Sequence, residues 1–300
     1  MRVFPSVIAG LLLALAGCAR PPALVPQPRY EVGQPYQLGG FWSYPREAFS
    51  LVETGLGQVL AEAGPRRTAN GEVFSGDAML AMHRTLQLPA IVTVTNLENG
   101  RAVTLRVVDR GPEQAGRMVA VSRRAGALLG AAPGAAFQAR LEVQAEGSRA
   151  LAEGLPQGGT TQAPVLALIA APVGRVERED LAPPEGARAG AVRAAPARAA
   201  AAEVTEATAT SLPPLRLAEE VWQGAPAPGR LFLDGGHYFT QSLAQRQAAR
   251  IGGRAEAVGP RSRQQEFRVR AGPFGSVAEA DAALARARAA GFAELRVVVE

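Results

Sequence analysis

Hydrophobic and polar positions alternate in the first half of the chain in the manner of short β-strands. Two β-rich runs, residues 91–95 and 102–108, flank a loop that ends in Asn99-Gly100, the pair that favours a hairpin turn. An alternating run near residues 139–143 predicts a further strand, and a short helix is expected at residues 122–129. Since little else here has a helical period, the pattern predicts a small β-barrel.

The C-terminal end has a second pattern, in which strand-like and helix-like periods follow one another in the order β-α-β-β-α-β. This order is that of a split βαβ sandwich, so we expect an α+β unit after a mostly-β one. Strands are expected at residues 231–239, 255–258, 266–271 and 295–299, and helices at residues 242–251 and 276–291.

The composition between these patterns suggests the domain plan. Residues 146–228 are rich in Ala, Pro, Gly, Glu and Arg and bury too little apolar surface to offset chain entropy, so we expect a disordered linker. It would join a barrel over residues 36–145 to the unit over residues 229–300. Residues 18–35 are proline-rich and are expected to be an extended tether.

The first 17 residues have the order of a secretory signal: a positive start, an uncharged apolar run over residues 7–15, and small residues before Cys18. The run is too short to cross a bilayer, which takes about 20 apolar residues. Leu-Ala-Gly-Cys also resembles the bacterial lipobox, which implies that Cys18 carries the lipid. Ala19 in place of aspartate favours the outer membrane, facing the periplasm. The alternative is an ordinary cysteine in a plain signal peptide.

Charge and cysteine content narrow the function classes. The chain has a net charge of +5, which suits an anionic partner such as peptidoglycan or nucleic acid, and export removes nucleic acid. Its single cysteine excludes an internal disulfide and a cysteine-based metal cluster. We expect no metal and no cofactor.

Five ordered sequence blocks carry a resemblance. The blocks lie at residues 36–47, 67–74, 82–89, 94–101 and 108–112, the last reading Val-Asp-Arg-Gly-Pro. Together they resemble the rare lipoprotein A (RlpA) family. The resemblance implies a double-psi β-barrel and a lytic transglycosylase acting at the division septum on glycan strands stripped of stem peptides. The C-terminal unit resembles a SPOR domain, which implies binding of the same denuded glycan and contact with division proteins.

The resemblance also implies roles for single residues. Asp109 is expected to be the acid and then the base of the reaction, because the 6-hydroxyl of the sugar replaces water and one carboxyl group serves twice. Glu72 and His83 fall on motif positions required for activity in the family. Substrate contacts are expected from four further positions in the motifs: Asn70, Arg110, Phe267 and Phe274.

Each of these residues has a second interpretation. Asp109 can cap the turn that follows it, Glu72 can be a solvated turn residue, and His83 can be structural. The chain also departs from the family: residues 57–64 lack its Trp-Tyr pair, and Ala120 stands where aspartate is typical. A catalytically degenerate, glycan-binding lipoprotein therefore remains an alternative. An RNA-binding fold has the same β-α-β-β-α-β order, but this chain lacks the aromatic motif of that fold.

Overall fold

The computed structural model describes residues 24–61, 64–158, 216–259, 265–292 and 295–300. The signal segment, Cys18 and the middle of the expected linker lie outside these residues. No helix within the described part is long and apolar enough to span a membrane.

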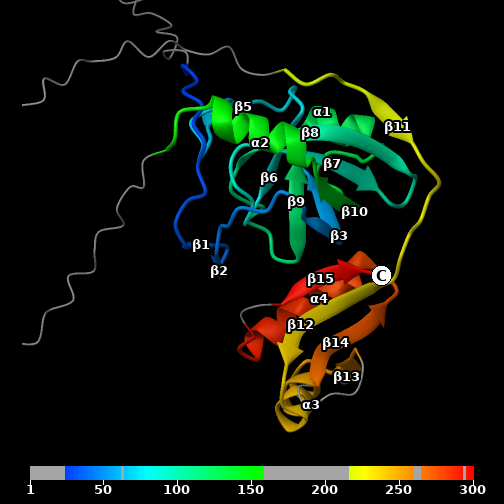
Figure 1. Ribbon diagram of the computed structural model, residues 1–300. Coiled ribbons are helices and arrows are strands. Elements are labelled where there is room, and N and C mark those ends of the chain that lie inside the picture. Colours follow the sequence, from blue (N-terminus) through cyan, green and yellow to red (C-terminus); the bar gives the residue numbers. More distant parts are fainter. Residues whose placement is uncertain (1–23, 62–63, 159–215, 260–264, 293–294) are drawn as a thin grey trace, which may run out of the picture. The chain divides into compact units, whose positions relative to one another are not determined.

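The first domain is mostly β. Its elements are β1 (Tyr36–Leu38), β2 (Phe41–Ser43), β3 (Val52–Val59), β4 (Arg66–Arg67), β5 (Val73–Phe74), β6 (Leu80–His83), β7 (Ala90–Asn96), β8 (Arg101–Asp109), β9 (Arg117–Val121), α1 (Arg123–Leu128), β10 (Ala136–Val143), α2 (Ala145–Gly154) and β11 (Val221–Gln223). In the described part, hydrogen bonding follows the order β8-β6-β9-β3-β10-β7, and β7 pairs again with β8. These six strands therefore close a barrel, with α1 and α2 outside it (Figure 1). The pairs β3–β9 and β6–β8 are parallel, whereas the other four are antiparallel.

Local sequence explains the β7–β8 hairpin, as the alternation predicted. Val92 and Val94 are fully buried and point into the barrel, while Thr93 between them is partly exposed. Gly100 ends the loop with φ +77°, a backbone conformation that side chains with a Cβ rarely adopt. Its N–H donates to the carbonyl of Asn96 at 2.8 Å, which closes the turn.

The barrel interior is packed with aliphatic side chains around one large aromatic ring. Phe137 is 1% exposed, and its ring lies against the backbone of Gly57 on the neighbouring strand. A Cβ at residue 57 would lie 2.5 Å from the ring, so only glycine fits there. The interior is therefore filled, and chemistry has to take place at the strand ends and on the outer surface.

Both ends of the expected linker that the structure describes carry structure, which corrects the prediction of disorder there. Residues 145–154 form α2, whose fully buried Ser148 binds the backbone of Ile91. Residues 221–223 form β11, which pairs antiparallel with the first residues of β8. Helix α2 is held by Ser148 and β11 by backbone pairing, and a composition rich in Ala, Pro and Gly marks neither contact.

The expected tether is also partly ordered. Tyr30 is 5% exposed, and its hydroxyl bonds the carboxylate of Glu47 at 2.5 Å. The backbone of Glu31 exchanges two hydrogen bonds with that of Leu88. The N–H groups of Gln27 and Arg29 also donate to carbonyls of the barrel, so the segment from Gln27 on is part of the barrel domain and not of an extended tether.

We expect Ser148→Ala to lower the free energy of unfolding of the barrel by about 1–3 kcal/mol. The hydroxyl accepts from the Ile91 N–H at 2.9 Å and donates to the Ile91 carbonyl at 3.2 Å, so the variant leaves a buried N–H unsatisfied. Urea unfolding followed by tryptophan fluorescence would measure the change. Ser50→Ala, at an exposed serine, is the control and should stay within about 0.5 kcal/mol of the parent. A Ser148 variant as stable as the control would contradict the anchoring role.

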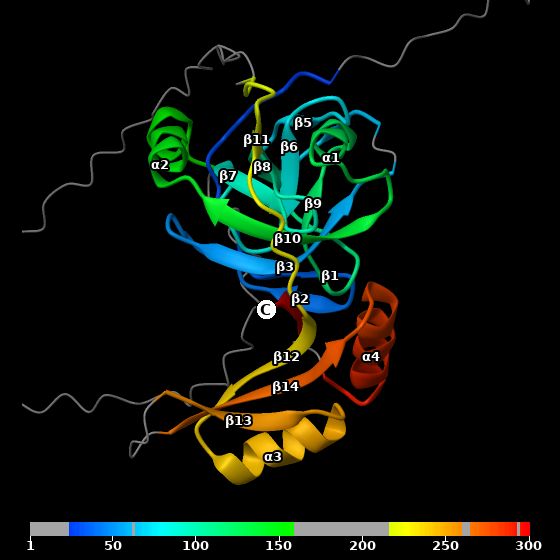
Figure 2. The same ribbon diagram turned by 90° about the vertical axis from the view of Figure 1, so that its right-hand side faces the viewer.

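The C-terminal domain has the predicted order β-α-β-β-α-β. Its elements are β12 (Leu231–Tyr238), α3 (Gln241–Arg250), β13 (Arg254–Val258), β14 (Glu266–Phe274), α4 (Val277–Ala289) and β15 (Arg296–Val299). The sheet order is β13-β14-β12-β15, all antiparallel, and Figure 2 shows α3 running beside β13 and β14. Alternate residues of β14, among them Val269 and Ala271, are buried in the clusters that the two helices cover. The residues between them therefore form a second, polar face of the sheet.

Candidate active site and glycan-binding face

Asp109 is the last residue of β8 and is only 6% exposed. Its Oδ1 accepts hydrogen bonds from the backbone N–H groups of Ala69, at 3.0 Å, and Arg110, at 2.9 Å. Its Oδ2 forms an ion pair with Arg66. All of these partners are donors, so the carboxyl group accepts on both oxygens, as an ionised carboxylate does.

Arg66 is a site residue that sequence reasoning missed. It lies on β4, one residue before the motif at residues 67–74, and its side chain is 44% exposed. The guanidinium lies 5.3 Å from the centre of the Phe74 ring, and Nη2 lies 3.7 Å from the sulfur of Met82. Because the Arg66 side chain is partly exposed, its guanidinium can move away from Asp109 into water, where it stays solvated. Its position next to the motif was the only available signal.

Glu72 and Asn70 shape the loop that holds Asp109. Glu72 is 4% exposed, and its Oε2 forms a 2.5 Å ion pair with Arg106 of β8. Its Oε1 accepts from the Asn70 side chain at 2.9 Å, and the Thr68 N–H donates to the Glu72 carbonyl at 2.9 Å. These bonds fix the turn whose Ala69 N–H binds Asp109. The structure thus places Glu72 and Asn70 in one network behind the acid, and Glu72 is not a solvated turn residue.

Arg110 lies directly after Asp109 but its side chain is used elsewhere. Its guanidinium donates to the carbonyls of Leu86 and Val32, each at 2.5 Å, and lies 5.8 Å from the centre of the Tyr36 ring. Burial lowers the pKa of Arg110 from its usual value. These contacts make Arg110 a clamp between the N-terminal segment and the end of β8, and they argue against the predicted substrate contact.

His83 is buried, and its contacts lead away from Asp109. Its Nδ1 accepts from the backbone N–H groups of Thr85 and Leu86, both at 3.2 Å, so the proton of the neutral ring lies on Nε2. Nε2 faces Oε2 of Glu53 at 3.4 Å. Burial raises the pKa of Glu53, but the hydrogen bond from His83 leads the contributions that outweigh it, so this pKa lies below its usual value. The geometry favours the structural interpretation of His83, with Glu53 as its partner.

A hollow of about 470 Å³ lies on the barrel next to the cross-strand partner of Asp109, and Asp109 itself is not among the residues that line it. Met82, the cross-strand partner of Asp109, lines it together with Pro112, Glu113 and Gln114 of the following loop. Residues from the end of β3 complete the wall. Glu113 is exposed and brings a second carboxylate to this region. The hollow is therefore connected to Asp109 through Met82 and through the loop that begins after Asp109.

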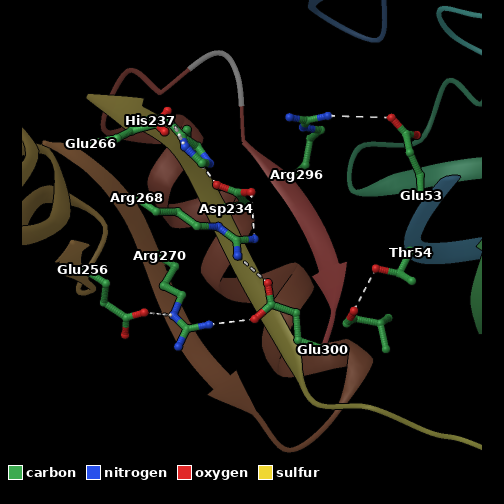
Figure 3. A network of polar contacts seen from close by, with 12 residues as sticks. Glu53, Thr54, Asp234, His237, Glu256, Glu266, Arg268, Arg270, Arg296 and Glu300 are labelled. Carbon is green, nitrogen blue, oxygen red and sulfur yellow. Dashed lines mark hydrogen bonds and ion pairs between the residues drawn. The ribbon is translucent and has the colours of Figure 1, made fainter. Parts of the chain in front are cut away.

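The polar face of the C-terminal sheet carries a network of arginines and carboxylates (Figure 3). Arg268 bonds Asp234 at 3.0 Å and Glu300 at 2.5 Å. Arg270 bonds the same Glu300 at 2.7 Å and Glu256 at 2.8 Å. Burial lowers the pKa of Arg268, but its hydrogen bonds to the carboxylates outweigh this and raise it. Beside this network, His237 bonds Glu266 at 2.8 Å.

Phe267 and Phe274 do not belong to this polar face. Both pack against the buried clusters beneath the helices, Phe267 with Val269 and Phe274 with Ala271. This placement argues against their predicted role in substrate binding. The aromatic ring on the polar face is Phe232, which lies beneath Arg270 at 4.6 Å from its guanidinium and is 3% exposed.

The expectation that the protein holds no metal can be compared with the structure only over the described residues. Among the described residues, no group of three or more His, Cys, Asp or Glu side chains is placed to hold a metal ion. Cys18, the expected lipid site, lies outside them.

Comparisons with known proteins agree with this architecture. The family described as "Lytic transglycolase" matches residues 55–140, and the SPOR domain family matches residues 227–297. The endolytic peptidoglycan transglycosylase RlpA of Pseudomonas aeruginosa is 30% identical over 288 residues, which cover 87% of this chain and 75% of that protein. The chain belongs to the RlpA family.

Other RlpA proteins match a shorter part of this chain. The protein of the same name from Rickettsia bellii is 37% identical over 113 residues, covering 36% of this chain and 50% of that protein. The one from Yersinia pestis is 39% identical over 106 residues, covering 33% of this chain and 29% of that protein. In these two comparisons the chain spans half or less of the relative. The family matches over residues 55–140 and 227–297 confirm the double-psi β-barrel and SPOR domains predicted from the sequence.

Proposed function

We propose that this RlpA-family protein is a lytic transglycosylase that cuts glycan strands lacking stem peptides at the division septum. The observation that carries the proposal is Asp109, a nearly buried carboxyl group at a strand end whose cross-strand partner, Met82, lines a hollow on the barrel. The RlpA relatives, named as endolytic peptidoglycan transglycosylases, support it.

The proposed reaction uses one carboxyl group twice. Asp109 in its acid form gives its proton to the glycosidic oxygen after N-acetylmuramic acid, and the bond from that oxygen to C1 breaks. The carboxylate then takes the proton of the 6-hydroxyl as O6 bonds to C1 and closes a 1,6-anhydro ring. The Arg66 ion pair has to open before the first step, because a paired carboxylate cannot donate.

The products distinguish this reaction from hydrolysis. Purified protein incubated with denuded strands should release fragments ending in 1,6-anhydromuramic acid, each lighter by one water than the hydrolytic product. Mass spectrometry of the fragments measures this difference. Fragments with free reducing ends would replace the proposal with a hydrolase, and intact strands would leave the glycan-binding alternative. That alternative is favoured by the donors that already occupy both oxygens of Asp109.

The C-terminal domain supplies the proposed binding function. A muramic acid without its stem peptide exposes a lactyl carboxylate, and a carboxylate is a group that a guanidinium binds in a bidentate manner. Arg268 and Arg270 already hold carboxylates on the polar face, and Glu300 bridges the two. We expect the lactyl group to take the place of Glu300, so the intramolecular network keeps both arginines ready for an anionic ligand.

Arg268→Gln should weaken binding of denuded glycan about ten- to hundredfold, because a hydrogen bond to a charged group contributes about 1.5–3 kcal/mol. Cosedimentation of the full chain with denuded strands measures the affinity, and rising salt should weaken the parent more than the variant. Arg246→Gln is the matched control, since it removes the same charge from an exposed position on α3. Equal binding by the two variants would remove Arg268 from the site.

Location completes the proposal. We propose export to the periplasm, anchoring in the outer membrane through lipid on Cys18, and contact with division proteins. The SPOR domain and the RlpA relatives support an envelope location and peptidoglycan as a partner. The chain would then be fixed at one end while its C-terminal domain finds denuded glycan.

A further inference from the structure

Two large aromatic side chains that lie close together in the sequence are exposed on the barrel domain. Trp42 and Tyr44 each have 57% of their surface exposed, whereas Ser43 between them is buried. Trp42 lies on β2 and Tyr44 directly follows it, so the two alternate residues share one face of the extended chain. A pair of neighbouring exposed rings is costly on a surface that has no partner for them.

The segment that carries these rings is fixed to the rest of the barrel. β1 and β2 form a hairpin, and the Tyr36 hydroxyl of β1 donates to the carbonyl of Arg84 at 2.9 Å. The Arg84 guanidinium donates back to the carbonyl of Leu38 at 3.2 Å. The same guanidinium lies 5.3 Å from the Phe41 ring, which is therefore already covered on that side. These contacts leave Trp42 and Tyr44 as the rings presented to solvent on a rigid support.

The hairpin also lies against the loop that follows Asp109. Arg84 donates to the carbonyl of Glu113 at 3.3 Å, and Gly39 at the hairpin tip has φ +61°. A Cβ at residue 39 would lie 2.2 Å from that same carbonyl oxygen, so the two backbones are in direct contact. Arg110 holds the hairpin from the other direction through the Tyr36 ring. The aromatic pair is thus connected through two arginines to the segment that carries the proposed acid.

The chemistry of a sugar fits such rings. A pyranose presents C–H groups on its flat faces and hydroxyls at its edges, so its face packs on an aromatic ring while its hydroxyls stay in water. The indole N–H and the phenol hydroxyl add hydrogen bonds at the ring edge. The chain lacks the Trp-Tyr pair before its residue 67–74 motif.

We propose that Trp42 and Tyr44 form a sugar-stacking subsite that holds the glycan strand beside the bond presented to Asp109. The proposal rests on the proposed function for its substrate, and it names the side chains of the barrel that hold that substrate. The subsite replaces the absent aromatic pair with rings from a different element.

The tryptophans provide the test, because the chain has two, Trp42 and Trp222, and the C-terminal domain has none. Trp222 is 48% exposed on β11 and pairs with Ala102, seven residues and about 23 Å along β8 from Asp109. In an Asp109→Asn background, Trp222→Phe leaves Trp42 as the reporter and Trp42→Phe leaves Trp222. We expect saturating denuded glycan to shift the emission of Trp42 to the blue and to protect it from acrylamide, while Trp222 does not respond.

Cosedimentation in the same samples separates the possible failures. Glycan bound to the full chain with no response from Trp42 would overturn the subsite, as would equal responses from both tryptophans. In the active chain, Trp42→Ala with Tyr44→Ala should raise KM about tenfold or more and change kcat less, and Trp222→Ala should change neither. If Trp42 responds and the active chain yields no anhydro product, the subsite stands and the lytic function fails.

Discussion

Asp109→Asn should lower the rate of anhydro-product release by about 10²- to 10⁴-fold, the range that a positioned acid or base contributes. Asparagine keeps the size of the side chain and can still accept the Ala69 and Arg110 N–H bonds through its carbonyl. It can neither give a proton to the glycosidic oxygen nor take one from the 6-hydroxyl. The rate therefore changes while the loop around the acid stays in place.

The measurement is the initial rate of anhydro-fragment release from denuded strands, with circular dichroism and urea unfolding as checks on folding. Asp77→Asn is the control, because the Asp77 side chain is 77% exposed and its ion pair with Arg123 lies on the surface. It should act at the parental rate. A folded Asp109→Asn protein that is as active as Asp77→Asn would exclude Asp109 as the acid.

The barrel strands could be predicted because their residues alternate on the two faces of a closed sheet. Val92 and Val94 pointed inward as the period required, and Gly100 marked the turn. The same reasoning failed for α2 and β11. Ser148 holds α2 by bonding a strand backbone, and β11 is held by backbone pairing with β8, so a composition rich in Ala and Pro suggested only disorder.

The candidate site was predicted in part for a similar reason. Asp109 follows an apolar strand and belongs to a motif, and both signals are visible in one dimension. Arg66 reaches it across 43 positions of the chain, and the hydrogen bonds of His83 Nδ1 and of the Arg110 guanidinium go to backbone groups, which no residue pattern marks. Phe267 was misplaced because the alternation of β14 does not say which face the helices cover. The packing of Val269 decides that.

Glu72→Gln should lower the free energy of unfolding of the barrel by about 3–5 kcal/mol, because it removes the negative partner from the buried ion pair between Glu72 and Arg106. That is a large part of the 5–15 kcal/mol typical of a domain. Urea unfolding followed by tryptophan fluorescence measures it. Glu142→Ala removes one partner of an exposed ion pair and should change stability by less than about 1 kcal/mol.

A second variant distinguishes two roles of Glu72, fixing the loop behind Asp109 and contacting the substrate. Glu72→Gln combined with Arg106→Met removes both buried charges, while the side-chain amide introduced at position 72 can still accept from Asn70, so most of the lost stability should return. If Glu72 acts by fixing the turn that carries the Ala69 N–H, product release should return with it, with kcat recovering as Asp109 regains its donor. A double variant that regains stability and stays inactive would show instead that the Glu72 carboxylate takes part in the reaction. In that case the ion pair seen with Arg106 would have to open during turnover, as we propose for Arg66.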